Sequence, residues 1–157
     1  MYRIGFSKDI HKLVKGRKLM LAGIHIPFNK GELAHSDGDV IIHAISEAML
    51  GAAALGDLGK FYPTNDKKYK NIASKEILID INKKIKKLKY QIENIDVSVE
   101  LEKPKLAPYI NKMRNNLAKI LKIKLDQISI KANTNEGLCV TGKGEAVIAY
   151  AVVLLKK

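Results

Sequence analysis

The chain has 157 residues, of which 46% are hydrophobic and 28% charged. These proportions exclude a largely disordered chain, and the length suits one domain over residues 1–157. A single cysteine, Cys139, excludes an intrachain disulfide framework and favours a reducing, cytoplasmic setting. The sequence has neither the apolar run of roughly 18–20 residues that a membrane helix needs nor an apolar signal core at its start, so we expect neither membrane insertion nor secretion.

The charge is strongly basic: 28 Lys and Arg face 16 Asp and Glu, for a net charge of +12. Such a surface can attract nucleic acids or phosphorylated metabolites. Only Arg3, Arg17 and Arg114 are arginines, whereas proteins that read base edges favour the bidentate guanidinium. The lysines at residues 83–89 also alternate with apolar residues at helical spacing. We interpret most of the charge as solvated helix surface and expect no nucleic-acid partner.

The first half of the chain predicts strands, then a long helix. In chain order we expect a strand at residues 2–6, a turn around Gly16, a strand at 19–26 and a polar loop at 28–38. The helix at 37–54 carries apolar residues at three- and four-residue steps, which indicates one buried stripe. Ser36 or Asp37 can cap its first turn. The loop at 55–73 that follows is long, and such loops are often functional.

The second half alternates helices and strands. We expect a helix at residues 75–89 capped by Ser74, a strand at 92–101, a helix at 108–122, and strands at 127–133 and 146–155. The last strand is continuously apolar, which predicts a central strand buried on both faces. The order of elements predicts an α+β fold, with a mixed sheet of four or five strands and helices on one face. The other face of this sheet then needs cover, which self-association can supply.

Three residues form a candidate metal site. Asp9 and His11 stand two apart, so on an extended segment both side chains project from one face. His43 lies on the predicted long helix. Two imidazoles and a carboxylate are a ligand set that zinc accepts, and three protein ligands leave the open position of a catalytic site. The spacing alone leaves open whether the three meet, and each residue by itself can be purely structural.

Three polar loops could hold a phosphorylated ligand. Residues 35–39 (H-S-D-G-D) precede the long helix, whose first N–H groups favour phosphate, although these residues also suit simple capping. Asp57, Gly59 and Asp66 are residue types that commonly form turns. The two carboxylates could also bind hydroxyl groups of a ligand, and Gly59 would allow the backbone to approach it closely. Residues 132–137 (A-N-T-N-E-G) follow a strand, and their hydroxyl, amide and carboxylate groups suit phosphates with a bridging Mg²⁺.

Seven stretches, in this order, resemble the family of 2-C-methyl-D-erythritol 2,4-cyclodiphosphate synthases, and the similarity spans about residues 3–155. They are D-I-H at 9–11, A-H-S-D-G-D-V at 34–40, His43, L-G-A-A-A-L-G-D-L-G-K at 50–60, P-K-L-A-P at 104–108, K-A-N-T-N-E-G-L at 131–138 and T-G-K-G-E at 141–145. The resemblance implies a homotrimer whose sheets face the trimer axis, with active sites between subunits. It implies a lyase of non-mevalonate isoprenoid biosynthesis, which closes 4-diphosphocytidyl-2-C-methyl-D-erythritol 2-phosphate into a cyclic diphosphate and expels CMP.

The same resemblance implies residue roles. It implies one zinc ion per subunit, held by Asp9, His11 and His43. His35 and Thr134 would stabilise the transition state, and Glu136 would bind a second divalent cation such as Mg²⁺ or Mn²⁺. Substrate contacts would come from Ser36, Asp57, Leu58, Gly59, Asp66, Lys105, Leu106, Ala107, Asn133, Asn135 and Lys143, with residues 101–107 shaping the cytidine pocket.

The chain departs from the family pattern in several places. Lys8 precedes Asp9 in an unusual G-F-S-K-D stretch. Residues 62–66 read Y-P-T-N-D where F-P-D-T-D is common, so Thr64 replaces an acid. Val140 and Lys143 replace a common Phe and Arg at positions that in some members line a central channel, and lysine cannot supply the bidentate fork of arginine.

Two other functions fit part of the pattern. A zinc hydrolase would share the three ligands, but it would release a hydrolysed product containing solvent oxygen. A basic nucleic-acid-binding domain would bind oligonucleotides with a steep salt dependence that His43→Ala would not change. The ordered motifs favour the cyclase over both.

Overall fold

The computed structural model describes residues 1–63, 65–69 and 71–157, so Thr64 lies outside the described residues. Its main sheet has five strands in the order β4-β1-β7-β5-β6. These are β4 (Lys30–Leu33), β1 (Tyr2–Lys15), β7 (Ala146–Lys156), β5 (Gln91–Glu100) and β6 (Ile128–Asn133). Only β5 and β6 run parallel; the other neighbours are antiparallel. The predicted mixed sheet is confirmed.

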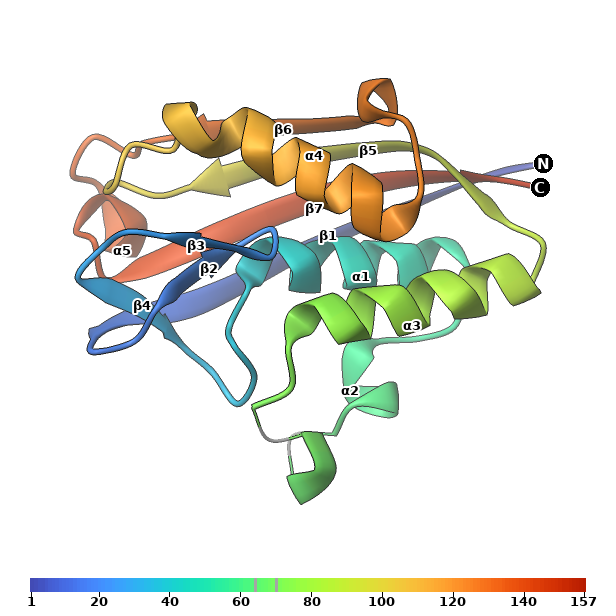
Figure 1. Ribbon diagram of the computed structural model, residues 1–157, viewed down its shortest axis with the longest axis horizontal. Helices are drawn as coiled ribbons and strands as arrows, with labels where there is room; N and C mark the ends of the chain where they lie inside the picture. Colours follow the sequence, from blue (N-terminus) through green and yellow to red (C-terminus); the bar gives the residue numbers. More distant parts are fainter. Residues whose placement is uncertain (64, 70) are drawn as a thin grey trace.

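The long helices all cover one face of this sheet, as predicted (Figure 1). They are α1 (Val40–Ala52), α3 (Ser74–Lys87) and α4 (Ile110–Leu121). Shorter helices are α2 (Leu58–Phe61) and α5 (Cys139–Gly142), with 3₁₀ turns at Lys67–Tyr69, Ala107–Tyr109 and Leu125–Gln127. Isoleucine, leucine, valine and alanine dominate the buried core between helices and sheet. None of the helices in the described ranges is long and apolar enough to span a membrane.

The N-terminal third differs from the prediction. The first strand runs on to Lys15, because its pairing with β7 continues to Lys12 and β4 pairs with residues 12–15. Instead of one strand at 19–26 there is a hairpin of β2 (Leu19–Leu21) and β3 (Ile24–Ile26), because Ala22 and Gly23 turn the chain with positive φ. The predicted loop at 28–38 contains β4.

Two predicted helix caps were also wrong. Asp39, not Ser36 or Asp37, caps α1: its side chain accepts the N–H of Ile42. Ser74 is the first residue of α3 rather than its cap, and the cap position, Ala73, offers no side-chain hydrogen bond. The N–H of Ser74 is instead satisfied by Asp37, from a distant part of the chain.

Gly5 sets how closely α1 approaches the sheet. A Cβ atom added at Gly5 would lie 1.9 Å from the carbonyl oxygen of Ala48, so only glycine allows this contact between β1 and the helix backbone. The contact is made with the backbone of α1 at Ala48 and Ala52, two small residues that allow this close packing. Since β1 carries Asp9 and His11 and α1 carries His43, this contact fixes the spacing of the candidate metal ligands.

The face of the sheet away from the helices is partly apolar. On β1 it presents Tyr2, Ile4, Phe6 and Ile10, whose exposed fractions run from 46% to 71%. The neighbouring strand β7 is central, as predicted, but Tyr150, Val152 and Leu154 are only half-buried. The prediction that β7 is buried on both faces is therefore wrong for an isolated chain, because that chain covers only one face.

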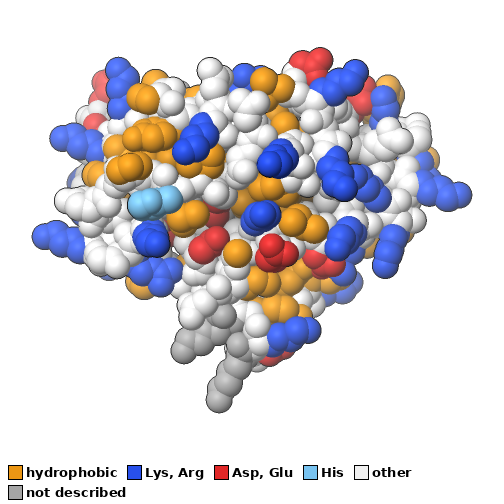
Figure 2. Space-filling view, viewed as in Figure 1, with side chains coloured by type: hydrophobic (Ala, Val, Ile, Leu, Met, Phe, Trp, Pro, Cys, Tyr) orange, Lys and Arg blue, Asp and Glu red, His pale blue; other side chains and the backbone are white. Residues whose placement is uncertain are grey.

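Lys and Arg side chains are scattered over the helix-bearing face and do not gather into one stripe (Figure 2). This distribution agrees with charge that decorates solvated helices.

A fully buried carboxyl, Glu32 on β4, predicts a pH-dependent stability. Burial and the nearby Asp39 carboxylate raise the pKa of Glu32 to about 9. The folded chain then keeps a proton that the unfolded chain loses above about pH 4.5. The contribution of Glu32 to stability is therefore full below that pH and falls, by up to about 1.4 kcal/mol per pH unit, as the pH rises towards 9.

We expect Glu32→Gln to flatten this decline between pH 6 and 9, because glutamine stays neutral and can still accept the N–H of Met20. Below pH 6 a slope should remain, since burial also raises the pKa of Asp39 to about 6. Urea unfolding at several pH values measures both slopes. A variant that loses stability between pH 6 and 9 as steeply as the parent would contradict this prediction.

Candidate metal and substrate site

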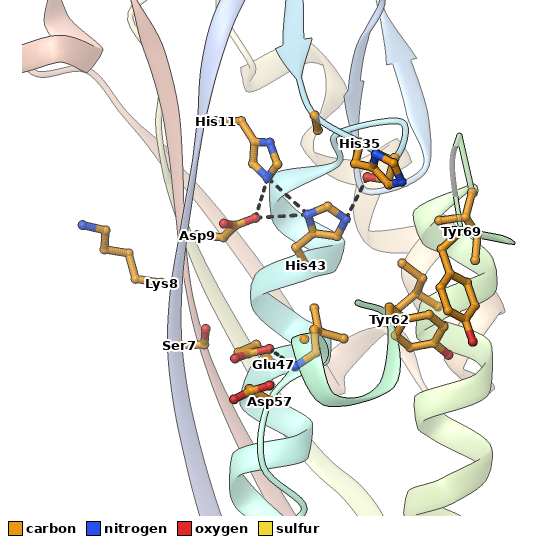
Figure 3. Close-up of a pocket in the computed structure, with 16 residues that line it drawn as sticks. Ser7, Lys8, Asp9, His11, His35, His43, Glu47, Asp57, Tyr62 and Tyr69 are labelled. Atoms are coloured by element: carbon orange, nitrogen blue, oxygen red, sulfur yellow. Dashed lines mark hydrogen bonds and ion pairs between the residues drawn. The ribbon is translucent and has the colours of Figure 1, made fainter. Parts of the chain in front are cut away.

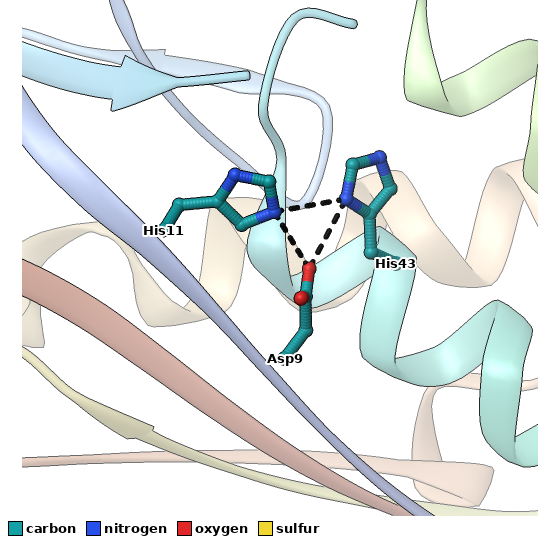
Figure 4. A group of neighbouring side chains, drawn as sticks. All are labelled: Asp9, His11 and His43. Atoms are coloured by element: carbon teal, nitrogen blue, oxygen red, sulfur yellow. Dashed lines mark hydrogen bonds and ion pairs between the residues drawn. The ribbon is translucent and has the colours of Figure 1, made fainter. Parts of the chain in front are cut away.

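Asp9, His11 and His43 converge, as the sequence predicts (Figure 4). Asp9 and His11 project from the same face of β1, and α1 brings His43 against them. Asp9 Oδ2 lies 2.7 Å from His11 Nε2 and 3.1 Å from His43 Nδ1. The two imidazole nitrogens are 3.2 Å apart. One oxygen and two nitrogens thus form a nearly equilateral triangle.

This triangle fits a tetrahedral cation. Bonds of 2.0–2.1 Å to nitrogen or oxygen in a tetrahedron separate neighbouring ligand atoms by about 3.3 Å, slightly more than the separations found here. A small outward shift of the three side chains would accommodate zinc. The fourth vertex would remain free for a ligand.

The electrostatics of the triangle favour a cation. Burial would raise the pKa of Asp9, but hydrogen bonds from His11 and His43 outweigh it and hold that pKa well below its usual value. Burial would lower the pKa of His43, yet contact with the Asp9 carboxylate leaves it above 6.5. A metal ion must displace the proton that this imidazole retains, so metal affinity should fall at acidic pH.

A cavity of about 560 Å³ adjoins the triangle (Figure 3). The predicted residues His35, Ser36, Asp57, Leu58 and Gly59 line it together with the three candidate ligands. It lies within one chain, between β1, α1, the 34–36 segment and α2. The structure therefore brings together one predicted cluster: the metal triangle, the residues before α1 and the turn that starts α2.

The cavity also has a lining residue that the sequence analysis missed, Glu47. Its carboxylate accepts the N–H of Leu58 at 2.8 Å, while Asp57 accepts the N–H of Lys60 at 2.9 Å. These two acids fix the start of α2 at the cavity wall. Glu47 lies four residues after His43 on α1, and this one-turn spacing could have identified it. Tyr62 and Tyr69, packed edge to face, form a further part of the wall.

Lys8 departs from the family pattern and lines part of the cavity, but it does not approach the metal triangle. Its side chain extends from β1 away from Asp9 and His43 (Figure 3). A role for Lys8 in holding a ligand on the metal is therefore not supported by this geometry.

The remaining predicted residues lie outside this cavity. Asn133 ends β6, and the exposed Thr134 and Glu136 follow it. Because β1 and β6 are three strand spacings apart in the sheet, roughly 14 Å separates this loop from the β1 ligands. Asn135 contacts Glu100 and Thr141 instead. Roles for these residues in catalysis or binding stay predictions.

The other predicted substrate contacts are likewise separate. Lys105 is exposed before a 3₁₀ turn that begins at the exposed Ala107, and Leu106 between them is buried in the core. Lys143 is exposed after α5, and Asp66 accepts the N–H of Lys68. A single chain does not bring them to the metal triangle, and their roles also stay predictions.

Comparisons with known proteins identify the family. The profile described as the YgbB family matches residues 2–156. A 2-C-methyl-D-erythritol 2,4-cyclodiphosphate synthase from Lachnospira eligens is 50% identical over 153 residues, which cover 98% of this chain and 84% of the relative. A synthase of the same name from Clostridium perfringens is 50% identical over 155 residues, with 99% of each chain covered.

Solved structures agree with this. The bifunctional IspDF from Campylobacter jejuni has a TM-score of 0.95 and 38% identity; the match covers 99% of this chain, which spans only 42% of that larger protein. A CDP complex of IspF from Plasmodium falciparum has a TM-score of 0.86 and 35% identity, with 98% and 95% of the two chains covered. The chain therefore belongs to the YgbB family, whose curated relatives are 2-C-methyl-D-erythritol 2,4-cyclodiphosphate synthases.

Proposed function

We propose that this chain, acting as a single domain in the cytoplasm, converts 4-diphosphocytidyl-2-C-methyl-D-erythritol 2-phosphate into 2-C-methyl-D-erythritol 2,4-cyclodiphosphate and CMP. The observation that carries this proposal is the convergence of Asp9, His11 and His43 beside a cavity, in a chain of this family. The CDP complex of the Plasmodium falciparum relative supports a cytidine diphosphate ligand.

The reaction suits the residues present. The 2-phosphate attacks the β-phosphorus of the same molecule, so no protein nucleophile is required, and CMP leaves with the electrons of the broken P–O bond. A flexible chain must be bent so that the attacking and leaving oxygens are in line, and such positioning can contribute about 7–11 kcal/mol. Asp57, Leu58 and Gly59 at the start of α2 would hold the methylerythritol hydroxyls. His35 and Ser36 would hydrogen-bond phosphate oxygens at the cavity mouth.

The metal triangle would hold Zn²⁺, which prefers two imidazoles and a carboxylate. A bound cation would supply Lewis-acid stabilisation of the charge that develops on the phosphate oxygens. Asp9, His11 and His43 hold their donor atoms toward one point, so little reorganisation is needed for that role. A second cation, Mg²⁺ or Mn²⁺, would bind at Glu136, with Thr134 alongside.

We further propose a homotrimer in which the active site is shared between subunits. The apolar face formed by β1 and β7 needs cover, and three copies packed about an axis would provide it. The same arrangement would carry the loop at 133–136 and residues 105–107 of one subunit toward the metal triangle of its neighbour. This arrangement would explain why the loop at 133–136 lies roughly 14 Å from the metal triangle within a single chain.

Subunit complementation tests the shared site. His43→Ala and Glu136→Gln chains should each be nearly inactive as homotrimers. Co-expressed in equal amounts, they should regain activity, because random mixing in a closed ring restores about one site in four. Light scattering at micromolar concentration should give a trimer mass. A monomeric mass, or mixed trimers as inactive as the separate variants, would contradict the shared site.

The activity itself is tested by phosphorus NMR. Incubation of the protein with the cytidine substrate, Zn²⁺ and Mg²⁺ should produce CMP and a cyclic diphosphate. In water enriched in ¹⁸O, the products should contain no solvent oxygen. Incorporation of ¹⁸O into a linear product would favour the zinc hydrolase and would refute the cyclase.

A further inference from the structure

The imidazole of His43 meets a second set of side chains on the side away from Asp9. Ser74 Oγ lies 2.9 Å from His43 Nε2, and Ser36 Oγ lies 3.2 Å from it. Ser74 is fully buried and Ser36 nearly so. A polar N–H in such a place needs a partner, because water cannot reach it freely.

The hydrogen bonds have only one consistent direction. The Asp37 carboxylate can only accept, so the hydroxyl of Ser74 donates to it. The lone pairs of Ser74 Oγ then face His43, whose Nε2 must carry the proton. Nδ1 lies on the opposite side of the ring, beside Asp9 Oδ2 and His11 Nε2, and donates to the Asp9 carboxylate in the metal-free chain. A cation bound there would displace that proton and accept the Nδ1 lone pair, while Nε2 keeps its proton.

We propose that Ser74 and Asp37 are positioning residues for the metal ligand His43. The relay from His43 Nε2–H through the Ser74 hydroxyl to Asp37 selects the tautomer that presents Nδ1 to the ion and fixes the plane of the ring. Histidine ligands of metal ions commonly donate their second N–H in this way, and loss of that partner typically costs 10–100-fold in metal affinity.

The relay also connects the metal site to α3. Asp37 accepts both the hydroxyl and the backbone N–H of Ser74, so it provides the cap that Ala73 cannot. The backbone N–H of Asp37 donates to Ile72, and that of Asn71 donates to His35. The start of α3 is thus held against the 35–37 segment, next to the cavity, and cannot shift without moving the partner of His43.

Helix capping alone would also explain these contacts. A measurement of zinc affinity distinguishes a pure capping role for Ser74 and Asp37 from a role in positioning His43. The inference rests on the metal site and not on the cyclase reaction, so its test uses the metal alone. Metal-free protein is titrated with Zn²⁺ in competition with a chromophoric chelator. We expect Ser74→Ala to weaken zinc binding 10–100-fold, and Asp37→Asn to weaken it as well.

Ser46 provides a matched control. It is a fully buried serine on α1, and within the described residues its hydroxyl has no hydrogen-bond partner. Ser46→Ala should leave zinc affinity unchanged. Because Asp37 acts through Ser74, Asp37→Asn should add little in the Ser74→Ala background. Equal zinc affinity in Ser74→Ala and Ser46→Ala would overturn the proposal, as would fully additive losses in the double variant.

A measurement on the unaltered protein covers the case in which Ser74→Ala does not fold. Long-range ¹H–¹⁵N correlation spectra of the zinc-loaded parent report which ring nitrogen of His43 carries a proton. We expect a protonated Nε2 and a metal-bound Nδ1. A protonated Nδ1 would overturn the relay.

Discussion

His43→Ala should lower the rate of cyclic diphosphate formation by at least about 10³-fold, which corresponds to about 4 kcal/mol of lost transition-state stabilisation. The substitution leaves Asp9 and His11 as a two-ligand site and removes the nitrogen that closes the triangle. Zinc content, measured by elemental analysis, should fall from about one ion per chain in the parent to a small fraction of that.

His25→Ala is the matched control. His25 is an exposed residue of the β2–β3 hairpin, so its removal should change neither zinc content nor rate. Circular dichroism of both variants should match that of the parent, which separates loss of the metal from loss of the fold. A His43→Ala protein that retains a full complement of zinc and parental turnover would refute the metal site.

Gly5→Ala should be among the most destabilising single-methyl additions in the chain. The new Cβ would overlap the carbonyl oxygen of Ala48, which belongs to helix backbone and cannot rotate away. Overpacking of this kind typically costs about 1–3 kcal/mol, and sometimes more. For a chain of this size, each kcal/mol lowers the melting temperature by about 2–4 °C. The forced separation of α1 from β1 should also weaken zinc binding, because His43 would move away from Asp9.

Gly51→Ala provides the comparison. Gly51 lies in the same helix, but a Cβ there would have no neighbour within 4 Å in the described structure. Alanine is favoured over glycine in a helix by roughly 0.5–1 kcal/mol, so this variant should melt at or above the parental temperature. Thermal and urea unfolding measure both variants. A Gly5→Ala protein as stable as the parent would contradict the close packing.

The pairing of Asp9 with His11, and the place of His43 on a helix, could be predicted from the sequence by short-range rules, whereas the meeting of all three was implied only by the family resemblance. Asp9 and His11 are two residues apart on one strand, and His43 lies on a helix with a clear apolar stripe. The long helices could be predicted for the same reason. Their apolar faces recur at helical spacing, and α3 and α4 each have a broad polar side.

Other features depend on contacts that a sequence pattern does not encode. The second half of β1 lacks an apolar alternation, because Lys8, Asp9 and His11 occupy it, and its extension is set by pairing with β7. The cap of α3 comes from Asp37, and the anchor of α2 comes from Glu47. The residue types of the loop after β6 suit a phosphate ligand, but its place in the same site as the metal triangle was implied only by the family resemblance, since no contact among the described residues joins the two.

The two ends of the chain lie side by side (Figure 1). The amino group of Met1 donates to the carbonyl of Lys157 at 3.1 Å, and the N–H of Lys157 donates to Met1 at 2.9 Å. Asp9 is eight residues farther along the chain than Met1, roughly 27 Å from this corner at the rise of a strand. A short linker could therefore join the ends into a circular permutant, and an affinity tag or reporter attached at either end would start far from the metal triangle.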